Sequence, residues 1–319
     1  MEKIPVIIDT DPGHDDAIAL MAALAADEWD IRGITVVAGN NTMDNNTNNA
    51  LRILEHFGRD IKVYRGAPKP MIQGQEVPED IHGKSGMDGT SLPDFARGRA
   101  EEKNAAQFLE DELKSTDQRI KIIAIGPLTN LGILLAAAPE VKDSIDEIVI
   151  MGGAALGGNK TPTTEFNIWQ DPEAAHIVFS SGIPLTMCGL DVTYQSALFE
   201  DDHQRIAALP GKAGKLATEI LTFYGAAVLK RGNQGIAIHD AVAVAKILRP
   251  ELFTSRMCNV VIDLDGKYTR GCTVTDLDDV TKAHKNVEVV LDVQREAFVD
   301  YLVGALEKLD AMGEGSAHD

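Results

Sequence analysis

The sequence predicts an open, mostly parallel α/β sheet with helices on both faces. Short apolar runs typical of buried strands alternate along the chain with longer amphipathic runs typical of helices, and this order builds parallel sheets. Hydrophobic residues make up 44% of the 319 residues, which is enough to fill a sizeable core. Sheets of this kind place their functional sites beyond the carboxyl ends of the strands.

The expected elements follow one another in regular order. Strands are predicted at 6–8, 31–37, 61–64, 120–125, 145–151 and 185–190, with helices between them at 17–25, 48–57, 105–113, 128–137 and 172–180. The segment 198–229 is typical of a helix broken near Pro210-Gly211. Strands at 258–263 and 287–293 and an amphipathic helix at 296–309 complete the chain. Because no linker or internal repeat interrupts this order, we expect a single domain.

The stretch 67–98 departs from the alternation. It is rich in Pro, Gly and polar residues and has little hydrophobic periodicity. A loop of this length inside a compact domain is usually functional, so we expect it to contribute to a site.

The composition excludes several classes of function. Asp and Glu number 49 against 30 Lys and Arg, a net charge of −19. Such a surface repels phosphodiester backbones and anionic membranes, but it suits a bound cation. Three cysteines are too few and too scattered for a disulfide framework or a zinc site. No apolar run reaches 18 residues and the first residues lack a signal-peptide pattern, so we expect a cytoplasmic protein.

The segment DTDPGHDD (residues 9–16) follows directly after the first predicted strand and holds four carboxylates. Carboxylates so close together repel one another unless a positive charge neutralises them. Their oxygens are the ligands that Ca²⁺ and Mg²⁺ prefer, whereas zinc prefers His and Cys. The alternative interpretation is a solvated acidic turn in which Asp15 or Asp16 caps the next helix.

Further motifs follow the acidic segment in a fixed order. They are DTDPGHDDA (9–17), GN (39–40), IHGKSGMDG (81–89), GPLTN (126–130), MGG (151–153), Asn159, EFNI (165–168), DPEAA (171–175), GLDVT (189–193) and HD (239–240). This pattern, spread over about 230 residues, resembles that of the nucleoside hydrolases, calcium-dependent enzymes that cleave the N-glycosidic bond of ribonucleosides. The first motif and the EFN segment are the most specific parts of the resemblance.

The resemblance implies a calcium site and a set of residues that bind ribose. Asp11, Asp16 and Asp240 match the carboxylates that bind calcium, and Ile125 occupies the position whose backbone carbonyl does so. Asp11 also matches the base that takes a proton from the attacking water. The residues that match those holding the ribose hydroxyls are Asp15, Asn40, Asn159, Glu165 and Asn167.

These implied roles agree with the chemistry of glycosidic bond cleavage. The ribosyl C–N bond breaks through an oxocarbenium-like transition state, and nearby carboxylates stabilise its positive charge. Calcium can position the water and the 2′ and 3′ hydroxyls, but it activates water less than zinc does, so a base such as Asp11 is still needed. The departing base must also be neutralised, and His239, beside Asp240, is the best candidate acid.

Several of these side chains also have simpler interpretations. His239 could be a packed histidine at the end of an element, and His82 could be an ordinary loop residue instead of one that faces the base. We expect an incidental role for His14. Asp9 could bind the metal or orient a residue that does, and we favour the second role. Asn40 and Asn167 could cap helices.

The segment before His239 departs from the family pattern. Relatives that accept any base, or prefer pyrimidines, carry polar or aromatic residues there that contact the base or leaving group. A gapless placement puts Ala227 and Arg231 at those positions, and Tyr224 or Gln234 would replace them if the register shifts. The sequence therefore leaves the preferred base open, whereas the calcium and ribose half of the site is intact.

We predict a single Rossmann-like domain over residues 1–319 that hydrolyses ribonucleosides to free base and ribose, in nucleoside salvage in a cytoplasm of prokaryotic type. We expect Ca²⁺ as cofactor, a homodimer or homotetramer, and binding to neither nucleic acid nor membrane. One alternative is a hydrolase of a modified or non-standard ribosyl compound. Another is an inactive nucleoside-binding sensor, against which Asp11 and His239 argue. A dinucleotide-binding dehydrogenase is excluded because the first strand leads into carboxylates and not into a GxGxxG phosphate loop.

Overall fold

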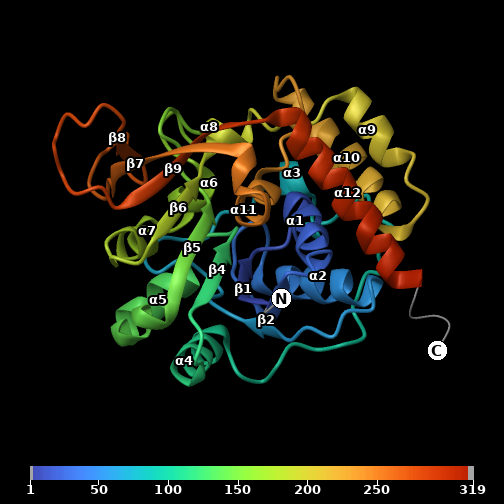
Figure 1. The fold of residues 1–319 in the computed structure, drawn as a ribbon, viewed down its shortest axis with the longest axis horizontal. Helices are drawn as coiled ribbons and strands as arrows, with labels where there is room; N and C mark the ends of the chain where they lie inside the picture. Colours follow the sequence, from blue (N-terminus) through green and yellow to red (C-terminus); the bar gives the residue numbers. More distant parts are fainter. Residues whose placement is uncertain (1–2, 315–319) are drawn as a thin grey trace.

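The computed structural model describes residues 3–314, in which helices cover both faces of a nine-stranded sheet (Figure 1). The strands are β1 (Ile4–Thr10), β2 (Trp29–Val36), β3 (Val63–Arg65), β4 (Ile120–Ala124), β5 (Ile145–Met151), β6 (Leu185–Cys188), β7 (Phe253–Ile262), β8 (Thr273–Asp276) and β9 (Val287–Val293). Their order in the sheet is β3-β2-β1-β4-β5-β6-β9-β7-β8. The predicted open, mostly parallel α/β fold is confirmed.

The central strands are apolar because both of their faces are covered. Ile8 of β1 lies opposite Ile34 of β2 on one side and Ile123 of β4 on the other, and all three are buried. Continuous apolar strands of this kind are typical of parallel sheets. The antiparallel pairs of the described sheet, β9–β7 and β7–β8, lie at its far edge.

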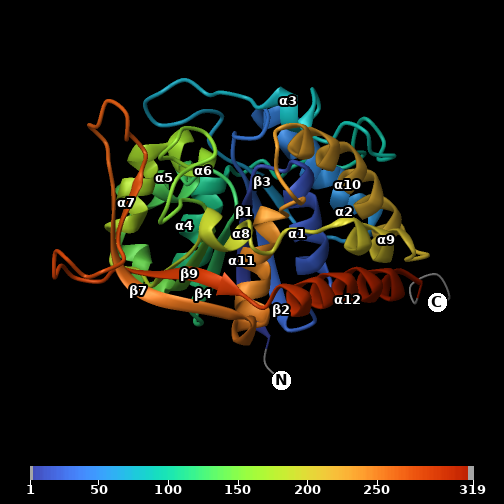
Figure 2. The same ribbon diagram turned by 90° about the horizontal axis from the view of Figure 1, so that it is seen from above.

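The helices divide into two layers (Figure 2). They are α1 (His14–Leu24), α2 (Met43–His56), α3 (Glu79–His82), α4 (Ala105–Ser115), α5 (Thr129–Ala137), α6 (Phe166–Gln170), α7 (Pro172–Phe179), α8 (Leu190–Thr193), α9 (Glu200–Ala207), α10 (Lys212–Lys230), α11 (His239–Leu248) and α12 (Arg295–Glu314). One hydrophobic core joins the sheet to α1, α2, α10, α11 and α12, and a second joins it to α4, α5 and α7.

Most predicted elements are present, with shifted boundaries. The first helix begins at His14 instead of residue 17, so Asp15 and Asp16 lie in its first turn. The segment 198–229 is broken as predicted, since α9 ends before Pro210 and α10 begins at Lys212. The helix α11, the short strand β8 and the antiparallel edge were not predicted.

The segment 67–98 is irregular apart from the single turn α3. Side-chain amides tie it across the carboxyl end of the sheet: Gln75 Nε2 donates to Asn41 O (2.8 Å), and Gln73 Nε2 donates to Trp169 O (2.6 Å). The long loop therefore runs beside the strand ends, where the site is expected.

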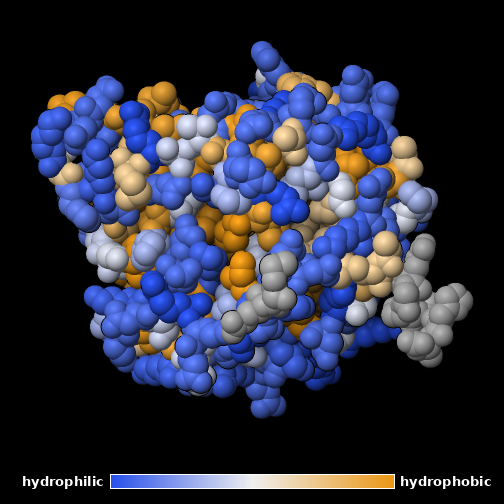
Figure 3. All heavy atoms as spheres, in the orientation of Figure 1, coloured by the Kyte–Doolittle hydropathy of each residue, from blue (hydrophilic) through white to orange (hydrophobic). Residues whose placement is uncertain are grey.

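The face of the molecule seen in Figure 3 is mainly hydrophilic, with hydrophobic side chains in small groups. Among residues 3–314, no helix is both long and apolar enough to cross a bilayer.

Candidate active site

A cavity of about 420 Å³ opens beyond the carboxyl ends of the central strands. The order of the strands reverses at the β1–β4 pair, which is where open α/β sheets bind ligands. Nine of the predicted site residues line the cavity: Asp15, Asn40, His82, Ile125, Asn159, Glu165, Asn167, His239 and Asp240. The remaining two, Asp11 and Asp16, are fully buried at the end of β1 and in the first turn of α1.

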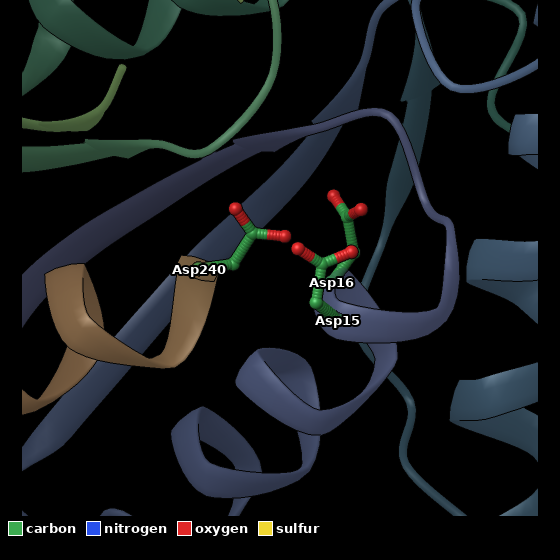
Figure 4. A group of neighbouring side chains, drawn as sticks. All are labelled: Asp15, Asp16 and Asp240. Atoms are coloured by element: carbon green, nitrogen blue, oxygen red, sulfur yellow. The ribbon is translucent and has the colours of Figure 1, made fainter. Parts of the chain in front are cut away.

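Three carboxylates meet at the base of the cavity. Asp15 and Asp16 come from the first turn of α1, and Asp240 comes from the first turn of α11 (Figure 4). One oxygen of each lies within 4.8 Å of the others. No Lys or Arg among the described residues forms an ion pair with them. Burial and mutual repulsion raise the pKa of Asp15 to about 8 and hold the pKa of Asp240 well above its usual range.

Asp11 is held beside this cluster in a close fit. Its Oδ2 accepts a hydrogen bond from Asn40 N (2.6 Å), while its buried Oδ1 has no partner among the described residues. A Cβ at Gly126 would lie 2.5 Å from Oδ1, and one at Gly39 would collide with Oδ2, so both positions require glycine. Burial, followed by the charge of Asp16, raises the pKa of Asp11 well above its usual value.

Asp16 belongs to the carboxylate cluster and also accepts several hydrogen bonds from neighbouring segments. It accepts hydrogen bonds from Thr10 Oγ1 (2.6 Å), Gly13 N (3.0 Å) and Asn40 Nδ2 (2.9 Å). The bond from Gly13 caps the start of α1, so the capping interpretation holds for this residue, although the turn is buried instead of solvated. Asn40 binds Asp11 through its backbone and Asp16 through its side chain.

Asp9 lies outside the cavity, in a separate buried network. It accepts hydrogen bonds from Asn130 Nδ2 (2.7 Å) and Thr35 Oγ1, and burial raises its pKa to about 7. Asn130 Oδ1 in turn accepts from Ala67 N (2.8 Å). Asp9 thus ties β1 to β2, to α5 and to the start of the long loop.

The expected ribose-binding residues cluster around the start of α6. Glu165 caps this helix: its Oε1 accepts from Asn167 N (2.9 Å), and its Oε2 accepts from Gly153 N (3.0 Å). Burial raises its pKa to about 7. Asn159 Oδ1 accepts from Phe166 N (2.9 Å). Asn167 Nδ2 donates to Ile125 O and to Met151 O, both at 3.1 Å. The helix cap here is Glu165, and not Asn167 as the simpler interpretation allowed.

His239 is the first residue of α11 and lines the cavity. Its Nδ1 lies 2.8 Å from Thr193 Oγ1, and its ring meets Tyr194 edge-on at 5.4 Å between centroids. Burial lowers its pKa to about 4, so the ring is uncharged at neutral pH. His239 is therefore packed at a helix end and also exposed to the cavity.

His82 lies opposite, in a stack of aromatic rings. Its ring packs on His14 and Tyr224, with centroids 5.4 and 5.6 Å away. His14 Nδ1 lies 3.2 Å from His82 Nδ1, and His14 Nε2 donates to Asp88 O (2.9 Å). We expected an incidental role for His14, but the structure places it directly behind His82. Nothing in the sequence signalled this contact, because 68 residues separate the two histidines.

The remaining wall of the cavity comes from α3 and the end of α10. Tyr224 and Arg231 line it, whereas Ala227 and Gln234 are not among the lining residues. Arg231 forms an ion pair with Asp80 across the cavity mouth. The sequence reasoning missed Tyr194, which follows the GLDVT motif, and Ile81, which precedes His82 in the IHG motif.

Strand-end carboxylates, amides and a histidine around one cavity are groups that hydrolase sites use. Comparisons with known proteins give the family. The sequence model of the inosine-uridine preferring nucleoside hydrolases matches residues 6–300. The chain belongs to this family and is an N-ribosyl hydrolase of the EC 3.2.2 type.

Individual relatives agree with this assignment. The pyrimidine-specific ribonucleoside hydrolase RihA of Shewanella woodyi is 42% identical over 311 residues, covering 95% of this chain and 98% of its own. The protein of the same name from Escherichia coli O127:H6 is 41% identical over 307 residues, with coverages of 95% and 98%. Among solved structures, a purine-preferring ribonucleoside hydrolase from Gardnerella vaginalis superposes with a TM-score of 0.89 at 35% identity, covering 97% of this chain and 99% of its own.

Proposed function

We propose that this protein is a calcium-dependent hydrolase that converts ribonucleosides to free base and ribose. The observation that carries the proposal is the convergence, on one cavity, of a buried carboxylate cluster, a set of polar side chains suited to ribose, and the histidine His239 next to Asp240 of the cluster. We further propose that the enzyme acts in nucleoside salvage in the cytoplasm, as a homodimer or homotetramer of a single domain.

The residues present fit a hard cation. The cluster offers only oxygen ligands, Asp11 Oδ1 is buried without a partner, and no cationic side chain of the described chain offsets the charge. Asp11, Asp16, Asp240 and the carbonyl of Ile125 would hold calcium, with Asp15 beside them. When bound, calcium supplies a fixed positive charge that keeps these carboxylates ionised despite their burial and polarises the oxygens near it.

The chain's own residues would then perform the remaining steps. Asp11, with one oxygen free of hydrogen bonds, accepts the proton of the attacking water. Asp15, Asn40, Asn159, Glu165 and Asn167 hold the ribose hydroxyls. The buried carboxylates stabilise the positive charge that develops on the sugar. His239, which lines the cavity at the start of α11, neutralises the departing base, and His82 faces the base.

We propose pyrimidine ribonucleosides as the preferred substrates, because the relatives that are 41–43% identical over 95% of the chain are named pyrimidine-specific. The test is a panel of uridine, cytidine, inosine and adenosine, read by reducing-sugar release. Uridine and cytidine should show the higher kcat/KM. A preference for purines would overturn the base assignment alone, whereas no sugar release from any of the four would overturn the proposed function.

Removal of calcium is expected to lower both activity and thermal stability. A ligand that binds only the native state at 100 times its Kd stabilises that state by about 2.7 kcal/mol, which shifts Tm by roughly 4 °C in a chain of this size. The measurement is a melting curve and a uridine assay before chelation, after it, and after calcium or magnesium is restored. If exhaustive chelation changes neither Tm nor activity, the calcium proposal is wrong.

A further inference from the structure

The GLDVT motif (residues 189–193) has no role in the chemistry proposed so far. It forms the single turn α8, which is anchored to the loop after β5: Leu190 N donates to Gly153 O (2.9 Å), and Asp191 accepts from Ala155 N (2.6 Å). Gly153 N in turn donates to Glu165, an expected ribose-binding residue. The motif is therefore fixed to the ribose end of the site.

The last residue of the motif reaches the leaving-group end. Thr193 is fully buried, and its Oγ1 lies 2.8 Å from His239 Nδ1. The hydroxyl hydrogen of Thr193 has no other acceptor among the described residues. If His239 Nδ1 were the donor in this contact, that buried hydrogen would be left without a partner, which is unfavourable. The hydroxyl therefore donates, and Nδ1 accepts.

This direction decides where the uncharged imidazole carries its hydrogen. With Nδ1 accepting, the hydrogen is on Nε2, which has no partner among the described residues. His239 lines the cavity, and its Nδ1 edge faces Thr193. Nε2–H is thus available to the base, on which negative charge builds as the C1′–N bond breaks. In the opposite tautomer, a lone pair on Nε2 would face that charge.

We propose that Thr193 is a positioning residue that fixes His239 in the Nε2–H tautomer and so directs a hydrogen-bond donor at the leaving base. The inference rests on the proposed function, because it requires His239 to act on the leaving group. The inference adds a residue that controls hydrogen-bond donation by His239. That residue, Thr193, belongs to the turn α8, which is anchored at the ribose end of the site.

The test compares near-isosteric variants of the metal-loaded full chain on two substrates. Thr193→Val removes the hydroxyl and keeps the volume, whereas Thr193→Ser keeps the hydroxyl. With uridine, Thr193→Val should lower kcat by roughly 10-fold to 10²-fold with a much smaller change in KM, since a donor to the leaving group acts mainly in the transition state. Thr193→Ser should stay within about 3-fold of the parent kcat. With p-nitrophenyl riboside, whose leaving group needs no such help, both variants should match the parent.

Two controls make the outcomes distinct. Ser196→Ala removes a buried hydroxyl from the same segment, one that donates to Thr193 O (2.8 Å) and does not touch His239, and it should leave both activities unchanged. His239→Ala should lose most activity on uridine and little on p-nitrophenyl riboside. Equal losses on both substrates for His239→Ala would overturn the leaving-group role in the proposed function, and this inference with it.

If His239→Ala behaves as expected, three results overturn the inference alone. They are a Thr193→Val variant with the parent kcat on uridine, a Thr193→Val variant that loses equally on both substrates, and a Thr193→Ser variant as impaired as Thr193→Val. The ¹⁵N shifts of His239 give an independent readout. We expect an unprotonated Nδ1 and a protonated Nε2 in the parent protein at neutral pH, and the reverse pattern would contradict the inference.

Discussion

Replacing Asp11 with asparagine should lower kcat by roughly 10³-fold, within the 10²-fold to 10⁴-fold range of a general base, while a ribose-like inhibitor still binds. The amide has the size of the carboxylate and can keep the hydrogen bond from Asn40 N. It cannot accept a proton from water. The fit between Gly39 and Gly126 holds either side chain in the same place, so the loss should reflect chemistry more than displacement.

The measurement is kcat on uridine together with inhibitor affinity, calcium content and Tm. Asp171→Asn is the control for the loss of a buried carboxylate: Asp171 caps α7 away from the cavity, and its second oxygen accepts from Thr129 Oγ1 (2.7 Å) and Met71 N (2.8 Å), so this variant should lose stability. That variant should keep its activity. An Asp11→Asn enzyme with more than a tenth of the parent kcat would contradict the role of Asp11 as base. A variant that loses calcium instead would assign the residue to metal binding alone.

Ribonucleosides should be better substrates than their 2′-deoxy analogues by about 10²-fold or more in kcat/KM. Asp15, Asn40, Glu165 and Asn167 are buried polar groups at the cavity wall, and a substrate without the hydroxyl would leave some of them unpaired. The 2′ hydroxyl should matter most, because we expect it to contact calcium as well.

The comparison is uridine with deoxyuridine and inosine with deoxyinosine, each pair assayed under the same conditions. Because the base is constant within a pair, the ratio isolates the sugar. Both pairs should give similar ratios even if their absolute rates differ greatly. Comparable kcat/KM values within each pair would show that the ribose hydroxyls do not organise this site.

The parts of the fold that could be predicted are those in which a local pattern and the tertiary environment agree. The sequence shows the apolar run of β1 and the break at Pro210-Gly211. In the structure this run is buried between β2 and β4, and the break separates α9 from α10. The helix α11 was missed because its first residues, His239 and Asp240, were interpreted only as site residues. The strand β8 has four residues and pairs only with β7, so no periodicity could mark it.

The candidate site also has a part that the sequence predicts and a part that it does not. Residues in family motifs were brought to one cavity, because motifs at strand ends meet at one edge of a parallel sheet. The contacts behind them could not be predicted: His14 behind His82 and Thr193 behind His239 each join segments far apart in the chain. Such contacts depend on how helices pack, which a single sequence does not encode as a pattern.

The two walls of the cavity differ in what holds them. Asp11 and Ile125 follow directly after strands of the sheet, and Asn167 is tied to backbone carbonyls at the ends of two strands. Ile81 belongs instead to the single turn α3 and Tyr224 to α10, with Arg231 directly after α10, and neither helix pairs with a strand. With the roles proposed above, the sheet holds the residues that act on the sugar, and peripheral helices hold those near the base. We expect substitutions in these helices to change which base is accepted and to leave the chemistry at the sugar unchanged.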